Sequence, residues 1–175
     1  MSDIWKFNGV HWSWIGGSDE VNVMSNSSFP GSIASAALWK RSNGEIYLYG
    51  GTRGNFTLGE LWKVRMVNKD QLEFVSEGGN CYTGPLCRSN PVTWLDSNEN
   101  LWLFGGQLDG ASYLDLWKYD VNSKEWTVRY GNVDRGTQGV PSSNAWPRGR
   151  WSANSWSRGD LLYFFGGKRK EGTCM

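Results

Sequence analysis

The chain has 175 residues, of which 20% are charged and 39% hydrophobic, and its formal net charge is +1. This composition is ordinary for a globular protein and excludes a disordered chain. The near-neutral charge argues against a nucleic-acid partner, and no apolar run approaches the roughly 18 residues of a membrane span, which argues against a membrane partner.

Short strands are expected throughout, because 12 Trp and 23 Gly stand against only 5 Pro. No window of helical length shows a sustained period of 3.6 residues. The first two predicted strands are Asp3–Phe7 and His11–Ile15, joined by the hairpin signal Asn8-Gly9. A polar loop is predicted for 16–29.

One unit then recurs along the chain. The segment 101–119 reads strand, double glycine, loop, strand; a copy spans 46–63, the first residues of the chain repeat its second half, and 161–167 repeat its first half. Trp5, Trp62 and Trp117 hold equivalent positions, 57 and 55 residues apart. A period of this length with four short strands is typical of a propeller blade rather than of a helical solenoid.

The central copy defines the predicted blade. Its four strands are Val92–Leu95, Leu101–Phe104, Leu116–Asp120 and about Trp126–Tyr130. Double glycines follow the second strand of each copy, at 50–51, 105–106 and 166–167. A residue without Cβ allows close approach and positive φ there, so the glycines have a mechanical explanation that needs no ligand.

These motifs resemble the kelch repeat, in the long-blade form of the galactose oxidase central domain. The resemblance is carried by Pro147-x-x-Arg150-x-Ser152, by the double glycines, by Asp115-Leu116-Trp117-Lys118-Tyr119 and by Trp126 in the outer strand. The first full copy departs from the pattern with Ile33 at the arginine position. Further departures are Pro91 inside a first strand, and Leu72 and Phe74 in place of an outer-strand tryptophan.

The resemblance implies an all-β fold of four-stranded antiparallel blades. The expected units are a half blade at 1–17, a blade at about 30–78, a blade at about 85–131 and a half blade at about 147–167. They amount to about three blades, whereas closed propellers usually have four to eight. We therefore expect an incomplete propeller, either a piece of a longer one or a chain that forms a homodimer by exchanging half blades.

Catalytic chemistry finds little support. A copper oxidase site needs more than one imidazole, and His11 is the only histidine, expected at the surface. We therefore expect no metal, no cofactor, no catalytic residue and no enzymatic activity. Asp3, Glu60 and Asp115 hold equivalent positions in three repeats and are expected to cap loop backbone rather than to act as an acid.

The tryptophans fall into two groups. The equivalent Trp5, Trp62 and Trp117 are expected in the core between blades, and a sugar-stacking platform is the alternative. The remaining candidates for exposed contact are Trp12, Trp14, Trp146 and Trp151.

Likeness to kelch propellers directs binding to one loop face, made here by 16–29, 77–88, 131–150, 52–59 and 107–113. Arg88 and Arg150 hold the motif arginine position, Arg148 lies beside the second, and Trp151 follows it. These four residues are the candidate binding residues, because an arginine can fork onto a partner's carboxylate. The alternative is that the arginines bind neighbouring loop carbonyls.

The favoured function is non-enzymatic binding of a protein or peptide through the loop face. The alternatives are a carbohydrate-binding or sugar-oxidase-related propeller fragment, and a truncated chain without activity of its own. A cytoplasmic location is favoured over a secreted one. Cys81 and Cys87 lie in one loop as either a small disulfide or two thiols, a choice that loop spacing leaves open.

Overall fold

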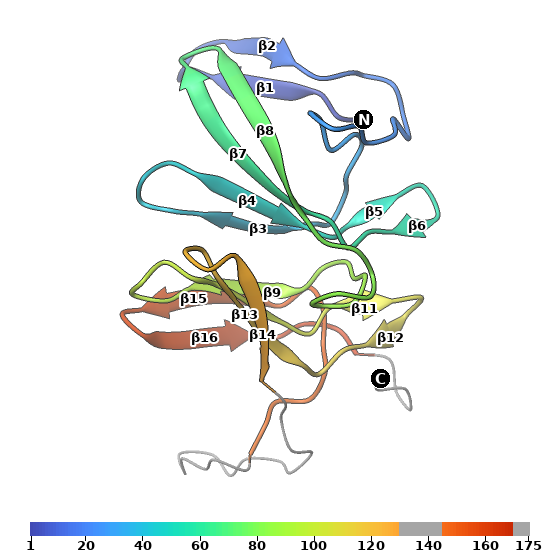
Figure 1. Cartoon of the computed structure of the whole chain (residues 1–175), viewed down its shortest axis with the longest axis vertical. Helices are drawn as coiled ribbons and strands as arrows, with labels where there is room; N and C mark the ends of the chain where they lie inside the picture. The colour runs from blue at the N-terminus through green and yellow to red at the C-terminus, as the bar shows by residue number, and fades with distance from the viewer. Residues whose placement is uncertain (130–144, 170–175) are drawn as a thin grey trace.

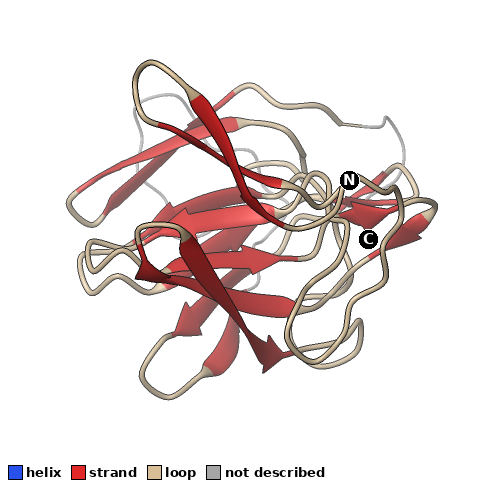
Figure 2. Ribbon diagram, turned by 90° about the horizontal axis from the view of Figure 1, so that it is seen from above, coloured by secondary structure: helices blue, strands red, loops and turns tan. Residues whose placement is uncertain are grey.

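A computed structural model describes residues 1–129 and 145–169, and these contain strands, turns and loops but no helix (Figures 1 and 2). The all-β fold predicted from the sequence is thus confirmed. Within the described residues, no helix offers the length and apolar character that crossing a membrane requires.

Two four-stranded antiparallel sheets form the centre of the molecule. The first has the order β3-β4-β7-β8, with β3 Ala37–Lys40, β4 Ile46–Tyr49, β7 Leu61–Asn68 and β8 Gln71–Gly78. The second has the order β9-β10-β13-β14, with β9 Val92–Leu95, β10 Leu101–Phe104, β13 Leu116–Asp120 and β14 Glu125–Arg129. The two sheets have the same strand order, so we call them the first and second blades.

A two-stranded hairpin lies at each end of the stack (Figure 1). The N-terminal half blade consists of β1 Ile4–Phe7 and β2 Trp12–Gly16. The C-terminal half blade consists of β15 Asn154–Arg158 and β16 Leu161–Phe165. Gly16 still belongs to β2, and the rest of the predicted loop, 17–29, pairs only through the isolated bridge between Asn26 and Phe29.

Two small hairpins lie inside segments that the sequence had marked as loops. They are β5 Thr52–Arg53 with β6 Phe56–Thr57, and β11 Gln107–Leu108 with β12 Ala111–Ser112. Both lie on the same side of the stack (Figure 1). Strands of two residues carry no detectable alternation, which is why the pattern did not reveal them.

The larger of two buried clusters lies between the two blades, and a smaller one, around Trp94 and Phe104, lies between the second blade and the C-terminal half blade. Strand β3 shows the alternation on which this depends, with Ala37 and Trp39 buried and Leu38 exposed. The larger cluster comprises Ala37, Trp39, Tyr47, Tyr49, Leu61, Leu101, Leu103 and Tyr119. Each such large side chain contributes about 1.5–3 kcal/mol when removed from water, so stacking supplies what short strands cannot bury alone.

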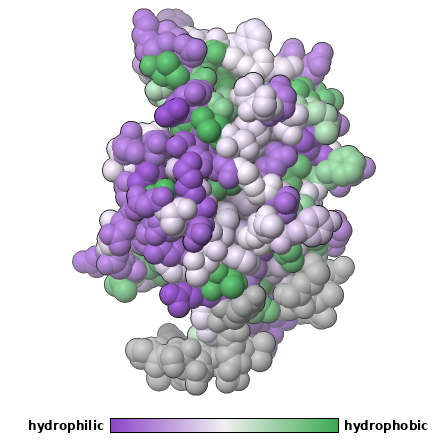
Figure 3. Space-filling view, viewed as in Figure 1, coloured by the Kyte–Doolittle hydropathy of each residue, from purple (hydrophilic) through white to green (hydrophobic). Residues whose placement is uncertain are grey.

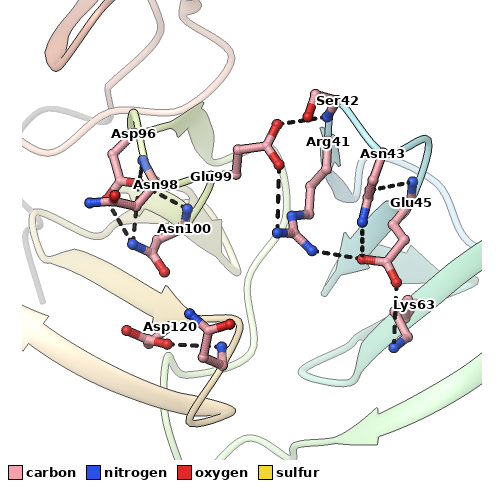
Figure 4. A network of polar contacts seen from close by, with 11 residues as sticks. Arg41, Ser42, Asn43, Glu45, Lys63, Asp96, Asn98, Glu99, Asn100 and Asp120 are labelled. Atoms are coloured by element: carbon pink, nitrogen blue, oxygen red, sulfur yellow. Dashed lines mark hydrogen bonds and ion pairs between the residues drawn. The ribbon is translucent and has the colours of Figure 1, made fainter.

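The contacts between neighbouring units recur in frame. The indole N–H of Trp39 donates to the carbonyl of Trp102 in the next blade at 2.9 Å, and that of Trp94 donates to Tyr163 of the C-terminal half blade at 2.6 Å. At the hairpin turns, Ser42 N–H donates to Glu99 at 2.7 Å (Figure 4). One unit further, Ser97 N–H donates to Asp160 at 3.1 Å. The first blade therefore docks on the second, and the second blade on the C-terminal half blade, through one repeated set of bonds.

The double glycines form part of this docking. Gly50 and Gly105 have φ of +65° and +66°, and a Cβ on either would collide with the carbonyl oxygen of the motif arginine of the next unit, Arg88 or Arg150. The following glycine N–H, at 51 or 106, donates to that same carbonyl at 2.9 Å. The predicted reason for glycine, positive φ with close backbone approach, is confirmed.

Candidate interaction surfaces

Arg88 is a fully buried cation, 0% exposed, that joins three parts of the second blade. Its Nη1 and Nη2 donate to the two oxygens of Asp115 at 2.6 and 2.8 Å, and its Nη1 also donates to the carbonyl of Gly105 at 2.8 Å. Its Nε donates to Leu86 at 2.9 Å, and the ring of Tyr113 lies 4.1 Å below the guanidinium. The candidate role of Arg88 as a contact for a partner is therefore corrected, because no donor face remains at the surface.

The repeated acidic residues accept a hydrogen bond from a tryptophan two positions later. The carboxylates of Asp3, Glu60 and Asp115 receive the indole N–H groups of Trp5, Trp62 and Trp117 at 2.6, 3.0 and 2.6 Å. We expected these side chains to accept hydrogen bonds from loop backbone, and this was wrong, because the donor is a tryptophan side chain. Each acidic residue directly precedes the strand that holds its tryptophan, and residues two apart in extended chain lie on one face, which places the two groups together.

In the first blade, an arginine outside the motif position binds the loop that leads into the blade. Ile33 holds the arginine position, and the buried side chain of Arg53 instead reaches the loop that leads into the blade. Its Nη2 donates to the carbonyl of Pro30 at 2.6 Å and its Nε to Ser32 at 3.2 Å. Sequence reasoning missed Arg53, because it lies out of the repeat frame.

Arg150 repeats the geometry of Arg88 in the C-terminal half blade. Its Nε donates to the carbonyl of Arg148 at 3.1 Å, its Nη1 donates to Gly166 at 3.0 Å, and Phe164 lies 4.8 Å from the guanidinium. Within residues 1–129 and 145–169, no carboxylate pairs with it. Burial and, to a smaller extent, nearby Arg169 lower the pKa of Arg150. Arg150 is thus a half-buried cation that, among the described residues, binds two backbone carbonyls and no carboxylate.

The other two candidate residues lie beside it. Arg148 is exposed and supplies the carbonyl that Arg150 binds. Trp151 is half-buried, and its backbone pairs with Lys168 in a bridge that corresponds to Ala34 with Thr52 and Ser89 with Gln107. The structure thus brings Arg148, Arg150 and Trp151 together at the C-terminal half blade and leaves Arg88 in the second blade.

Both half blades expose apolar side chains that their counterparts in the complete blades bury. Trp62 is 3% exposed, whereas the equivalent Trp5 is 52% exposed, so the expectation of a core position holds for Trp62 and for the partly buried Trp117 but not for Trp5. A hollow of about 640 Å³ lies beside the N-terminal half blade, lined in part by Lys6, Trp14 and Asp70. The exposed residues are Trp5, Phe7, Trp12 and Trp14 at one end, and Trp156, Leu161, Tyr163 and Phe165 at the other.

A third apolar region lies on the loops beside β5 and β6, and Figure 3 shows apolar side chains on that side of the molecule. Tyr82 is 89% exposed, and Phe56 and Leu86 are exposed too. The structure joins Cys81 and Cys87 in a disulfide that closes the loop carrying Tyr82. We call Phe56, Tyr82 and Leu86 the loop surface.

A groove of about 410 Å³, lined by both polar and apolar side chains, separates the outer strands of the two blades. Glu77 lies in it with Lys124 at 2.9 Å and Lys63 at 3.3 Å. Burial raises the pKa of Glu77, but the hydrogen bonds from Lys124 and Lys63 outweigh it and the net pKa is lowered. The carboxylate is therefore ionised and neutralised, an arrangement that joins the blades rather than one that transfers protons.

Metal chemistry finds no donor set in the part of the chain that the structure describes. No cluster of three or more His, Cys, Asp or Glu side chains is present there. His11 is exposed in the N-terminal half blade, as the sequence led us to expect.

No family model and no curated protein matches this sequence. A solved structure described as "Structure of YjhT" is similar, with a TM-score of 0.61 and 14% sequence identity. The likeness covers 93% of this chain and 43% of that chain. It shows a shared fold, and this chain spans less than half the length of that neighbour.

Proposed function

We propose that the chain is a non-enzymatic module that binds a protein or peptide through the loop surface. The observation that carries the proposal is an almost fully exposed aromatic side chain, Tyr82, on a loop that is held in place on several sides. Exposed aromatic residues on a fixed support are typical anchors of protein interfaces.

The support is well defined. Asn80 caps the loop by accepting the N–H groups of Tyr82 and Thr83 at 2.7 and 2.9 Å. The hydroxyl of Tyr49 donates to the carbonyl of Pro85, and burial raises the pKa of Tyr49, so this donor stays protonated. A loop that is already ordered loses less conformational entropy on binding, which favours affinity.

The members of the loop surface come from neighbouring loops. The N–H of Arg88 donates to the carbonyl of Leu58, just after the hairpin that carries Phe56, at 3.2 Å. The sulfur of Cys87 lies close to Gly59. A peptide with aromatic or aliphatic side chains fits this surface, since Phe56, Tyr82 and Leu86 are apolar or aromatic and uncharged. The in-frame contacts between blades support our further proposal that the repeats are of kelch type.

The experiment is selection of binding peptides from a random displayed library on the purified chain, followed by titration of the selected peptides. The double variant Phe56→Ser with Tyr82→Ser should weaken binding at least about tenfold, because each change removes an exposed apolar anchor. Met66→Ser is the matched control, since Met66 is exposed at the far end of β7.

Titration with a panel of soluble sugars forms the second arm. Peptide binding that depends on Phe56 and Tyr82, with no response to sugars, supports the proposal. Sugar binding without peptide binding, or peptide binding that the double variant leaves unchanged, contradicts it.

A further inference from the structure

The two half blades are complementary in their strands. In the second blade β10 pairs with both β9 and β13, whereas the equivalent β16 pairs only with β15 within the described residues. Likewise β13 pairs with β10 and β14, whereas the equivalent β1 pairs only with β2 there. The C-terminal half blade therefore has the two inner strands of a blade, and the N-terminal half blade has the two outer strands.

The half blades are complementary in charge as well. Arg150 reproduces the bonds of Arg88 to two backbone carbonyls, but among residues 1–129 and 145–169 no carboxylate binds it as Asp115 binds Arg88. Asp3 holds the position of Asp115 at the start of the missing strand, and it already accepts the indole of Trp5 as Asp115 accepts that of Trp117. The acidic side chain that Arg150 lacks is thus present, at the equivalent position, in the N-terminal half blade.

We propose that two copies of the chain exchange half blades, so that β16 of each pairs with β1 of the other and Arg150 binds the partner's Asp3. The pairing of Leu101 with Tyr119 and of Phe104 with Leu116 in the second blade sets the register. It places Leu162 opposite the partner's Phe7, and Phe165 opposite the partner's Ile4. We call the resulting sheet, made of β15 and β16 of one copy and β1 and β2 of the other, a composite blade. The antiparallel ladder continues across it without a break.

A second copy fits this role, whereas the chain's own half blade does not. The two half blades lie at opposite ends of the stack with both complete blades between them (Figure 1). The described residues of two copies together contribute four complete blades and two composite ones, a number within the usual four to eight of a closed propeller. The exchange is symmetric, so both free edges and both exposed apolar faces are covered at once.

Two charge variants test the inference. Asp3→Arg places two cations at each composite blade of its own dimer, and Arg150→Glu places two carboxylates there. Each variant alone should raise the dimer dissociation constant at least about 100-fold, because a close opposite-charge pair becomes a like-charge pair. In an equimolar mixture, one composite blade joins the unaltered Arg150 of the first variant to the unaltered Asp3 of the second. The other composite blade joins the two introduced side chains, which form an opposite-charge pair with the signs exchanged. Light scattering should therefore show dimers only after mixing.

The mixture keeps the test independent of folding, since a misfolded variant could not be rescued by another. The control is Arg158→Glu, which changes an exposed residue at the end of β15, away from Arg150. This variant should dimerise like the unaltered chain. A monomeric unaltered chain, single variants that dimerise normally, or a mixture that stays monomeric would overturn the inference.

Discussion

Arg88 is tolerated in the interior because acceptors surround its guanidinium. One carboxylate, two carbonyls and an aromatic face satisfy it, and the bonds join the start of the blade to the end of β10 and to the start of β13. A buried cation with this set of partners has a structural role, because it holds these segments together. The same residue type at 150, with fewer partners, becomes a candidate contact, so the surroundings of the residue decide its role.

Replacing Arg88 with Met should lower the free energy of unfolding by about 3–5 kcal/mol, because it leaves two carbonyls without this donor and Asp115 with only the indole of Trp117. Urea denaturation measures the loss. The control is Arg65→Met, which removes an ion pair with Glu73 whose side chains are about half exposed and should cost less than about 1 kcal/mol. Equal losses for the two variants would show that the bonds of Arg88 do not stabilise the fold more than an exposed ion pair does.

Glu77 makes stability depend on pH. Its lowered pKa means that the folded chain favours the ionised carboxylate, so this stabilisation is complete above the ordinary value of 4.5 and is lost as the pH falls below it. Thermal melts between about pH 3 and pH 7 should show a smaller acid-induced drop in Tm for Glu77→Gln than for the unaltered chain. Parallel curves for the two proteins would assign the acid sensitivity to other carboxylates.

At the scale of the element, neighbouring units are joined by hydrogen bonds whose acceptors are backbone carbonyls. The double glycine after the second strand allows the next unit's arginine carbonyl to approach, and the indole of the first strand donates to the next unit. Neither contact needs a particular side chain on the receiving carbonyl. This explains how sheets with different sequences repeat one geometry.

Alanine substitutions at Gly105 and Gly159 distinguish two causes of destabilisation, collision of the added Cβ with a neighbour and strain of the backbone at positive φ. Both have positive φ, +66° and +57°, but a Cβ on Gly105 would meet the carbonyl of Arg150 while one on Gly159 would meet nothing. Gly105→Ala should therefore destabilise the chain by about 2 kcal/mol or more beyond Gly159→Ala, as measured by urea denaturation. Similar losses would mean that strain alone explains the glycine.

Repetition determined how much of this could be predicted from the sequence. The strands around Trp94 and Trp117 and the double glycines were predictable, because each recurs at a fixed spacing. Arg53 was not, because it compensates for Ile33 in space and not in frame. The bond from Trp117 to Asp115 carried a readable signal, the two-residue spacing on a strand, whereas the burial of Arg88 depends on packing that no spacing reveals.

At the scale of the whole molecule, the described residues form two complete blades and two complementary half blades. The half blades leave free strand edges and exposed tryptophans, which are liabilities in an isolated chain. Exchange between two copies would cover them and leave the loop surface available to a partner. Assembly and binding thus use different surfaces, and each can be altered without the other.

Amide hydrogen exchange on the unaltered chain tests the pairing of β1 with β16 most directly. Half of the amides of each strand point away from its own hairpin partner, and the proposed dimer pairs them with the partner copy. We predict that these amides of Leu161–Phe165 and Ile4–Phe7 exchange as slowly as those of β10 and β13. Rapid exchange at both edges, with slow exchange in the two complete blades, would contradict the half-blade exchange.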